Sequence, residues 1–186
     1  MKIPNEIEGM DRVTSVLYPF SGMHTIDPEI VRKAAHRGSI VHQVCDCIIS
    51  DLPMDDYDPS YEGYINSFKL WKDGKTFLKK PGRFFDDELM ITGECDGLYE
   101  ENGEITLFDL KTPTREGSTW GMQGAAYAHL AKKVGYKIAR LEFVRLRKDG
   151  KVAVVYHYPL MMQDFLICLQ VYRKYFKNII TENFDY

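Results

Sequence analysis

Two aspartates occupy matching places in the stretch ITGECDGLYEENGEITLFDLKT, which covers residues 91–112. Asp96 and Asp109 fall in two strand-like runs separated by Asn102-Gly103, the strongest short signal for a β-hairpin. If Asn102 and Gly103 form the turn, Asp96 lies directly opposite Asp109, with Cβ atoms about 4.5–5.5 Å apart. The spacing therefore predicts two carboxylates facing each other on one side of a sheet.

A lysine completes this group. Because side chains alternate along a strand, Lys111 shares the face of Asp109 and is predicted to lie opposite Glu94. Two ionised carboxylates at this separation repel each other unless a cation neutralises them. Carboxylate oxygens suit Mg²⁺ or Mn²⁺ better than zinc, so the chemistry would be that of a divalent metal site. The alternative is a solvated hairpin in which Lys111 only pairs with Glu94 or Asp109.

Hydrophobic periodicity and cap signals predict the elements that position these residues. The predicted helices cover 28–50, 60–74, 120–135 and 161–181, and the predicted strands cover 76–78, 84–99, 104–112, 137–148 and 151–160. Asp27 and Pro28 are typical of the start of a helix, and Ser118 or Thr119 is the expected cap of the third helix. This order predicts an α/β fold in which a central mixed β-sheet is flanked by α-helices.

The composition favours one soluble, cytoplasmic domain spanning residues 1–186. With 45% hydrophobic residues, the chain can fill one core but is too short for two ordinary domains. No stretch approaches the roughly 18 apolar residues of a membrane span, and the first residues carry acids without an apolar leader. The cysteines form no CxxC pair, which favours free thiols; they are Cys45, Cys47, Cys95 and Cys168.

Charge is unevenly distributed, although the net charge of −3 argues against a generic polyanion binder. Nine acids and no Lys or Arg lie in residues 86–109, whereas eight bases and two acids lie in residues 132–151. An acidic centre followed by a basic band suits a metal site beside a phosphate-binding surface. Two solvated surfaces are the alternative.

Four motifs together resemble the PD-(D/E)XK nuclease superfamily, specifically its RecB-like and lambda-exonuclease-like branch. They are R-G-S-I-V-H at 37–42, G-E-C-D-G at 93–97, F-D-L-K-T at 108–112 and W-G-M-Q-G-A-A-Y at 120–127, in the family's order and roughly its spacing. Cys95 stands where the family has proline before its first aspartate. The resemblance implies a restriction-endonuclease-like core and phosphodiester hydrolysis with Mg²⁺, for which Mn²⁺ would substitute.

The resemblance also implies roles for individual residues. The metal would be bound or approached by Asp96, Asp109, the Leu110 carbonyl and His42. Asp96 and Asp109 would share the catalytic work with Lys111, which would orient the attacking water or stabilise charge at the phosphate. Gln123 and Tyr127 would line the site from the third helix.

Weaker candidates surround this set. Arg37, Arg115 and the basic band would hold the DNA backbone without reading bases. Glu88 is a further weak candidate for substrate binding. Glu88 and Glu94 are also candidates for additional metal ligands.

Structural roles are the alternatives for several of these residues. His42 on an inward helix face is often a hydrogen-bonded core histidine, and Gln123 and Tyr127, four residues apart, could be a packing pair. An aromatic stripe at helical spacing is interpreted as core rather than a base-stacking platform; it comprises Tyr61, Tyr64, Phe68 and Trp71.

The expected function is a metal-dependent DNA exonuclease acting in recombination, repair or phage replication. DNA is the expected substrate, and a further copy of the chain or a recombinase or single-strand annealing protein are candidate partners. The cysteine positions predict no iron-sulfur cluster. The alternatives are a structure-selective or nicking endonuclease on the same site, or a non-catalytic nucleic-acid-binding subunit.

Overall fold

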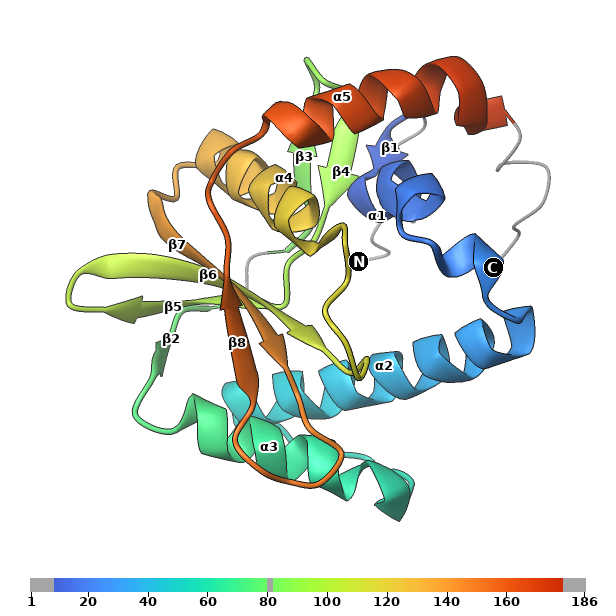
Figure 1. Cartoon of the computed structure of the whole chain (residues 1–186). Helices are drawn as coiled ribbons and strands as arrows, with labels where there is room; N and C mark the ends of the chain where they lie inside the picture. The colour runs from blue at the N-terminus through green and yellow to red at the C-terminus, as the bar shows by residue number, and fades with distance from the viewer. Residues whose placement is uncertain (1–8, 80–81, 179–186) are drawn as a thin grey trace.

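A five-stranded sheet forms the centre of the computed structural model, which describes residues 9–79 and 82–178 (Figure 1). Its order is β2-β5-β6-β7-β8. The strands are β2 (Thr76–Phe77), β5 (Gly97–Glu101), β6 (Glu104–Lys111), β7 (Ile138–Arg145) and β8 (Val154–His157). β6 and β7 run parallel, whereas the other neighbours are antiparallel. The predicted α/β class with a mixed sheet is therefore confirmed, and β6 is its central strand.

Helices cover both faces of this sheet (Figure 1). They are α1 (Val13–Leu17), α2 (Pro28–Ser50), α3 (Glu62–Lys72), α4 (Trp120–Lys133) and α5 (Gln163–Val171), with short helical turns η1 (Tyr18–Phe20), η2 (Met23–Thr25), η3 (Pro59–Tyr61) and η4 (Tyr172–Phe176). On one face, α2 and α3 pack against Phe108 and Leu110 of β6. On the other, α1, α4 and α5 pack around Leu107 and Phe143. β6 is thus buried on both sides.

The helix boundaries follow the predicted signals with one exception. At the start of α2, the Asp27 carboxylate accepts a hydrogen bond from the Glu29 amide at 2.8 Å, as its cap position predicts. At α4, Thr119 holds the cap position but makes no side-chain cap bond, and the Ser118 hydroxyl donates to the Phe20 carbonyl instead. Of the two predicted caps of α4, Thr119 is therefore the cap residue, and Ser118 is the exception, because its hydroxyl is used in a contact distant in sequence.

The strand predicted over 84–99 is also wrong, because this segment divides into three strands in two sheets. β3 (Phe84–Asp86) and β4 (Ile91–Gly93) pair antiparallel and join β1 (Asp11–Arg12) in a second sheet of order β1-β4-β3. The chain reverses between β3 and β4 at Met90, which has a left-handed φ of +51°. Alternation alone cannot reveal this reversal, since strands of three residues are too short to show where one ends and the next begins.

The hairpin register, in contrast, is the predicted one. β5 and β6 pair from Glu101 with Glu104 to Gly97 with Phe108. Asn102 and Gly103 both have positive φ, as the predicted two-residue turn requires. The ladder begins at Gly97, where a Cβ atom would lie 2.6 Å from the Phe108 ring, and the chain therefore enters this sheet directly after Asp96.

Two predictions about side chains are confirmed, one about the aromatic stripe and one about the cysteines. The aromatic stripe of α3 is core, since Tyr64, Phe68 and Trp71 are buried and Tyr61 packs against them. The four cysteines are free. Among the residues 9–79 and 82–178, no helix is both long and apolar enough to cross a membrane.

The two ends of the described chain meet. The Asp11 carboxylate, which is buried, lies 2.7 Å from both Arg173 Nε and Lys177 Nζ. The helix predicted over 161–181 is present as α5 and η4, and its residues 179–181 lie outside the described ranges. β1 and α1 were not predicted, because a strand of two residues has no periodicity to detect.

Asp86 fastens the second sheet to α4. Its buried carboxylate accepts hydrogen bonds from the Glu88 and Leu89 amides at 2.9 and 3.0 Å. The same group lies 2.6 Å from His129 Nε2 and 3.6 Å from Lys133 Nζ. Burial acts to raise the pKa of Asp86, but the bonds from His129 and the two amides outweigh it and lower the pKa.

This lowered pKa predicts a pH-dependent stability difference for Asp86→Asn. A carboxyl with a depressed pKa stabilises the folded state above its ordinary value near 4, and this contribution is lost as the pH falls through the lowered pKa. We expect the variant to lose about 2 kcal/mol at pH 7. Urea unfolding of both proteins at pH 7 and pH 3 measures the difference, which should shrink at pH 3; an equal loss at both values would contradict the assignment.

Candidate active site

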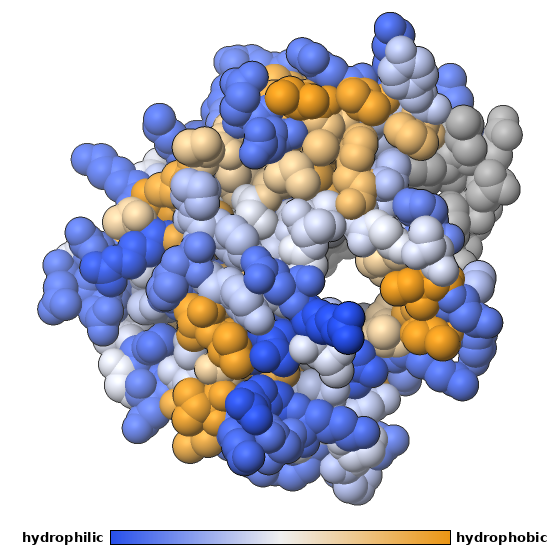
Figure 2. Space-filling model, in the orientation of Figure 1, coloured by the Kyte–Doolittle hydropathy of each residue, from blue (hydrophilic) through white to orange (hydrophobic). Residues whose placement is uncertain are grey.

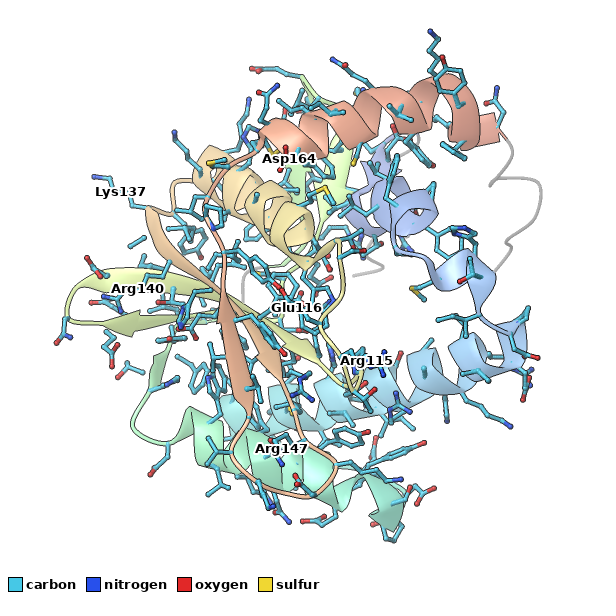
Figure 3. All side chains as sticks on the ribbon, viewed as in Figure 1. Arg115, Glu116, Lys137, Arg140, Arg147 and Asp164 are labelled. Atoms are coloured by element: carbon cyan, nitrogen blue, oxygen red, sulfur yellow. The ribbon has the colours of Figure 1, made fainter. Side chains whose placement is uncertain are left out.

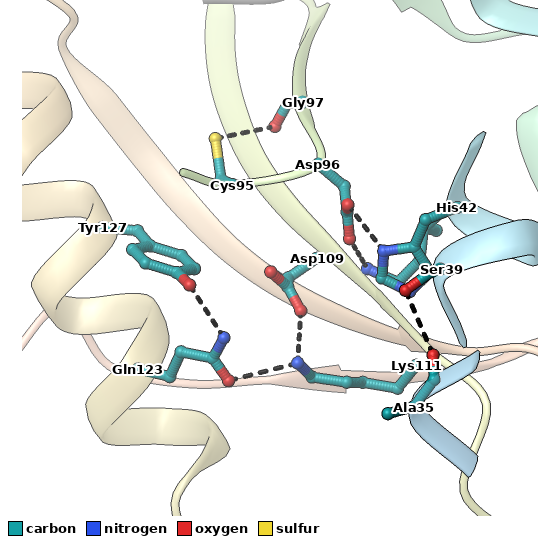
Figure 4. A network of polar contacts seen from close by, with 11 residues as sticks. Ala35, Ser39, His42, Cys95, Asp96, Gly97, Asp109, Lys111, Gln123 and Tyr127 are labelled. Carbon is teal, nitrogen blue, oxygen red and sulfur yellow. Dashed lines mark hydrogen bonds and ion pairs between the residues drawn. The ribbon is translucent and has the colours of Figure 1, made fainter. Parts of the chain in front are cut away.

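The C-terminal end of β6 carries two charged side chains that face α4, although most other residues of this strand are apolar. Because side chains alternate, Leu107, Asp109 and Lys111 share one face of β6, and Leu107 lies in the core while the other two reach the end of the sheet. Asp109 is 4% exposed. The parallel neighbour β7 and the packing of α4 exclude solvent there, and the carboxylate faces the polar side chains of Lys111 and Gln123 (Figure 4).

The Lys111 ammonium is held by three kinds of contact. Its Nζ atom lies 2.6 Å from Asp109 Oδ2 and donates to Gln123 Oε1 at 3.1 Å (Figure 4). Gln123 Nε2 in turn donates to the Tyr127 hydroxyl at 3.0 Å, one turn further along α4. The ammonium also lies 5.1 Å from the centre of the Phe143 ring, within the range of a cation–π contact. Lys111 is thus fixed in position rather than extended into solvent.

Asp96 is held from the opposite side. His42 Nδ1, on α2, lies 2.8 Å from Asp96 Oδ1, and the Leu110 amide donates to Asp96 Oδ2 at 2.6 Å (Figure 4). In an extended strand the N–H and C=O of one residue point to the same side, so the Leu110 carbonyl also faces the side of Asp96. Asp96, Asp109, Lys111 and His42 are therefore brought together, as the sequence predicts.

The two carboxylates differ in their tendency to ionise. Burial raises the pKa of Asp109; Lys111 opposes this and the nearby Asp96 adds to it, so the net shift is upward. Burial also acts to raise the pKa of Asp96, but His42 and the Leu110 amide outweigh it and the net shift is downward. For His42, burial acts to lower the pKa, yet the Asp96 carboxylate prevails and raises it. Asp96 is thus the firmly anionic member of the pair.

One oxygen of this site lacks a proper hydrogen bond. Asp109 Oδ2 is buried, and although the Lys111 ammonium is close, no donor in residues 9–79 and 82–178 meets hydrogen-bonding geometry at this atom. Within the same ranges, no three His, Cys, Asp or Glu side chains form a ready-made metal cluster. A cation at this place would be held by Asp96, Asp109 and the Leu110 carbonyl, with water completing its shell.

The weaker candidates from the sequence do not all lie at the site. Arg37 lies on α2 five residues before His42 and has its guanidinium carbon 5.7 Å from the centre of the Tyr64 ring. Arg115 is exposed on the loop after β6, beside α2 (Figure 3). Glu88 does not belong to the site, because its exposed side chain pairs with Lys133 at the far end of α4.

The predicted partner of Lys111 is wrong. Glu94 follows β4 in the second sheet and lies 3.6 Å from Arg83, whereas the residue aligned with Lys111 is Arg145 of the parallel strand β7. Arg145 was not singled out from the sequence. Its Nη1 donates to the Thr114 carbonyl at 3.1 Å, so it supports the loop that follows Lys111. Only the register of β6 with β7 could have identified it.

The basic band does not form one surface. Lys137, Arg140 and Arg147 lie at well-separated places in Figure 3. Arg140 pairs with Glu101 and Glu104 across the hairpin, and Arg147 pairs with Asp149. Closeness in sequence is therefore not closeness in space here, and Arg145 is the member of the band that lies at the candidate site.

No family model and no curated protein matches the chain. Among solved structures it is similar to SSO0001, with 15% identity, 91% of this chain and 77% of that chain covered, and a TM-score of 0.45. It is also similar to the alkaline exonuclease LHK-Exo from Laribacter hongkongensis, with 12% identity, 94% of each chain covered and a TM-score of 0.42. The complex of LHK-Exo with dAMP gives 14% identity, 94% coverage of each chain and a TM-score of 0.33.

Proposed function

We propose that the chain is a metal-dependent DNA nuclease that hydrolyses phosphodiester bonds, and specifically an exonuclease with a restriction-endonuclease-like core. The observation that carries this proposal is the close pair of Asp96, which is half-buried, and Asp109, which is buried, with the fixed ammonium of Lys111 beside it. Two carboxylates that raise each other's cost of ionisation do not stabilise a sheet. Their presence together is explained by a cation that they hold.

The donor set fits Mg²⁺ or Mn²⁺. Carboxylate and carbonyl oxygens are hard ligands, and Mg²⁺ is commonly held by one or two carboxylates with several waters and substrate phosphates. The buried oxygen of Asp109 that lacks a hydrogen bond is a natural ligand atom. His42 would keep Asp96 oriented and ionised through its 2.8 Å contact rather than complete the shell itself. When bound, the metal would supply a nucleophilic water at neutral pH and offset charge on the phosphate.

The side chains of the site have separate tasks in this reaction. Lys111 places a positive charge where the phosphate gains negative charge, and the surrounding rings of Phe143 and Trp120 keep water from screening it. Gln123 fixes the direction of the ammonium, and Tyr127 fixes Gln123. Because these contacts exist before substrate binds, little reorganisation is required during hydrolysis.

Arginines beside the site suit the DNA backbone. Arg115 lies in the segment that follows Lys111, and Arg145 donates to the Thr114 carbonyl in the same segment (Figure 3). The buried Nε atoms of Arg37 and Arg145 have no hydrogen-bond partner among the described residues. Guanidinium groups bind phosphate by paired hydrogen bonds and carry no base information. We therefore infer weak sequence preference and a strong dependence on salt.

The experiment compares end-labelled linear DNA with covalently closed circular DNA in Mg²⁺, Mn²⁺ and EDTA. We expect metal-dependent loss of the linear DNA alone. Cleavage of the closed circle would favour the structure-selective or nicking endonuclease. If neither DNA is cut with either metal while DNA is still bound, the chain is instead a binding subunit, and the catalytic proposal fails.

A further inference from the structure

A cavity lies beside the C-terminal end of α4. It has a volume of about 460 Å³, and the residues of its wall that bear on its chemistry are His129, Lys132, Tyr136, Lys137, Leu160 and Met162. Cavities of roughly 300–1,000 Å³ are typical of small-ligand sites. None of these residues belongs to the candidate active site, so the cavity needs a separate explanation.

The helix itself separates this cavity from the active site. With 3.6 residues per turn, each residue of α4 is rotated by about 100° from the one before. Gln123 and Tyr127 therefore point within about 40° of each other, whereas His129 and Lys132 point about 120° and about 180° away from Gln123. A ligand in the cavity would lie behind α4, on the side away from the site of hydrolysis.

The cavity carries unneutralised positive charge. No carboxylate in the described ranges pairs with Lys132 or Lys137, whereas the neighbouring Lys133 is paired with Asp86 and Glu88. Asp86 does not repel an anion here, because His129, Lys133 and two backbone amides already surround it. Lys132 and Lys137 are therefore free to take an anion.

The rest of the wall is apolar and includes an aromatic ring. Tyr136 packs edge-on against Phe84, with the ring centres 6.4 Å apart, which holds its ring in place. Figure 2 shows hydrophobic and hydrophilic side chains next to one another on this face of the molecule. The exposed large apolar side chains include Leu160, which lines the cavity, and its sequence neighbour Met161. A flat, weakly polar group would cover this surface and stack on the tyrosine.

We propose that this cavity binds a nucleoside monophosphate, with its phosphate between Lys132 and Lys137 and its base against Tyr136. A phosphate monoester carries a charge of about −1.5 to −2 at pH 7, which two ammonium groups balance. A carboxylate would leave one lysine unneutralised. The base supplies the flat group that the apolar wall requires. This site is independent of the proposed nuclease activity, since it lies on the other face of α4.

The test is calorimetric titration of the full chain in EDTA, so that neither metal nor hydrolysis takes part. The probes are thymidine 5′-monophosphate, thymidine and inorganic phosphate. We expect the monophosphate to bind more tightly than either fragment. The double variant Lys132→Ala/Lys137→Ala should weaken its binding by about tenfold or more, through loss of two charge-assisted contacts.

The matched control is Lys148→Ala/Lys151→Ala, which removes two lysines from the turn between β7 and β8 and should bind as the parent does. Equal binding of inorganic phosphate and monophosphate would overturn the proposal, as would undiminished binding by the first double variant or an absence of binding by the parent. If the DNA assay showed that the chain is not a nuclease, the expected binding of the monophosphate would be unchanged. The two proposals therefore fail separately.

Discussion

Lys111→Ala should reduce the rate of DNA hydrolysis by about 10²–10³-fold while leaving the protein folded. The variant removes a preorganised positive charge that lies 2.6 Å from Asp109 and close to the proposed position of the phosphate. Alanine also cannot donate a hydrogen bond to Gln123, as the ammonium of Lys111 does. The measurement is single-turnover degradation of end-labelled linear DNA at saturating Mg²⁺.

The control for this variant is Lys151→Ala, whose ammonium is exposed and lies 3.7 Å from Asp149. It should retain the parental rate. Thermal unfolding of both variants establishes that each is folded at the assay temperature. A Lys111→Ala protein that is folded and hydrolyses DNA at the parental rate would show that the lysine is structural, as in the simple salt-bridge interpretation of the hairpin.

Asp109→Asn should abolish the stabilisation that Mg²⁺ gives to the parent protein. A ligand that binds only the folded state stabilises it by about 2.7 kcal/mol at one hundred times its dissociation constant. Replacing one of the two carboxylates removes a charged ligand of the proposed site, so the shift in Tm with Mg²⁺ should disappear. Differential scanning calorimetry with and without Mg²⁺ measures this without relying on activity.

In EDTA, the same variant should be about as stable as the parent. Burial and Asp96 raise the pKa of Asp109 in the folded state, so its ionisation costs stability above the ordinary carboxyl value near 4. Asparagine removes that cost but also removes the partner of Lys111, and the two effects oppose each other. A variant whose Tm still rises with Mg²⁺ as much as that of the parent would exclude Asp109 as a metal ligand.

The hairpin could be predicted in detail because its information is local. Asn102 and Gly103 accept positive φ, and this turn fixes every later pair, down to Gly97 with Phe108. Likewise, Asp27 and Pro28 mark the start of α2 through contacts within one turn. Each of these predictions depends on residues that are neighbours in sequence. Tertiary contacts do not replace these local contacts in the structure.

The failures concern partners that are distant in sequence. Glu94 was placed opposite Lys111 by extending the hairpin register, but the ladder begins only at Gly97, and the strand that precedes Glu94 belongs to the second sheet. The position beside Lys111 belongs to Arg145, which arrives through the parallel crossover of α4. No local pattern sets the register of β6 against β7, since packing of α4 on the sheet determines it.

By itself, therefore, the sequence determined the residue types of the site and the register of the hairpin between Asp96 and Asp109, because a two-residue turn fixes the register of its strands. It also determined that Gln123 and Tyr127 lie one turn apart on a helix. Only the tertiary structure decided that His42 holds Asp96, that Gln123 holds Lys111, and that Asp109 is buried enough for its pKa to rise. These properties depend on how α2 and α4 pack on the two faces of the sheet, and packing between distant elements is not encoded in any short segment.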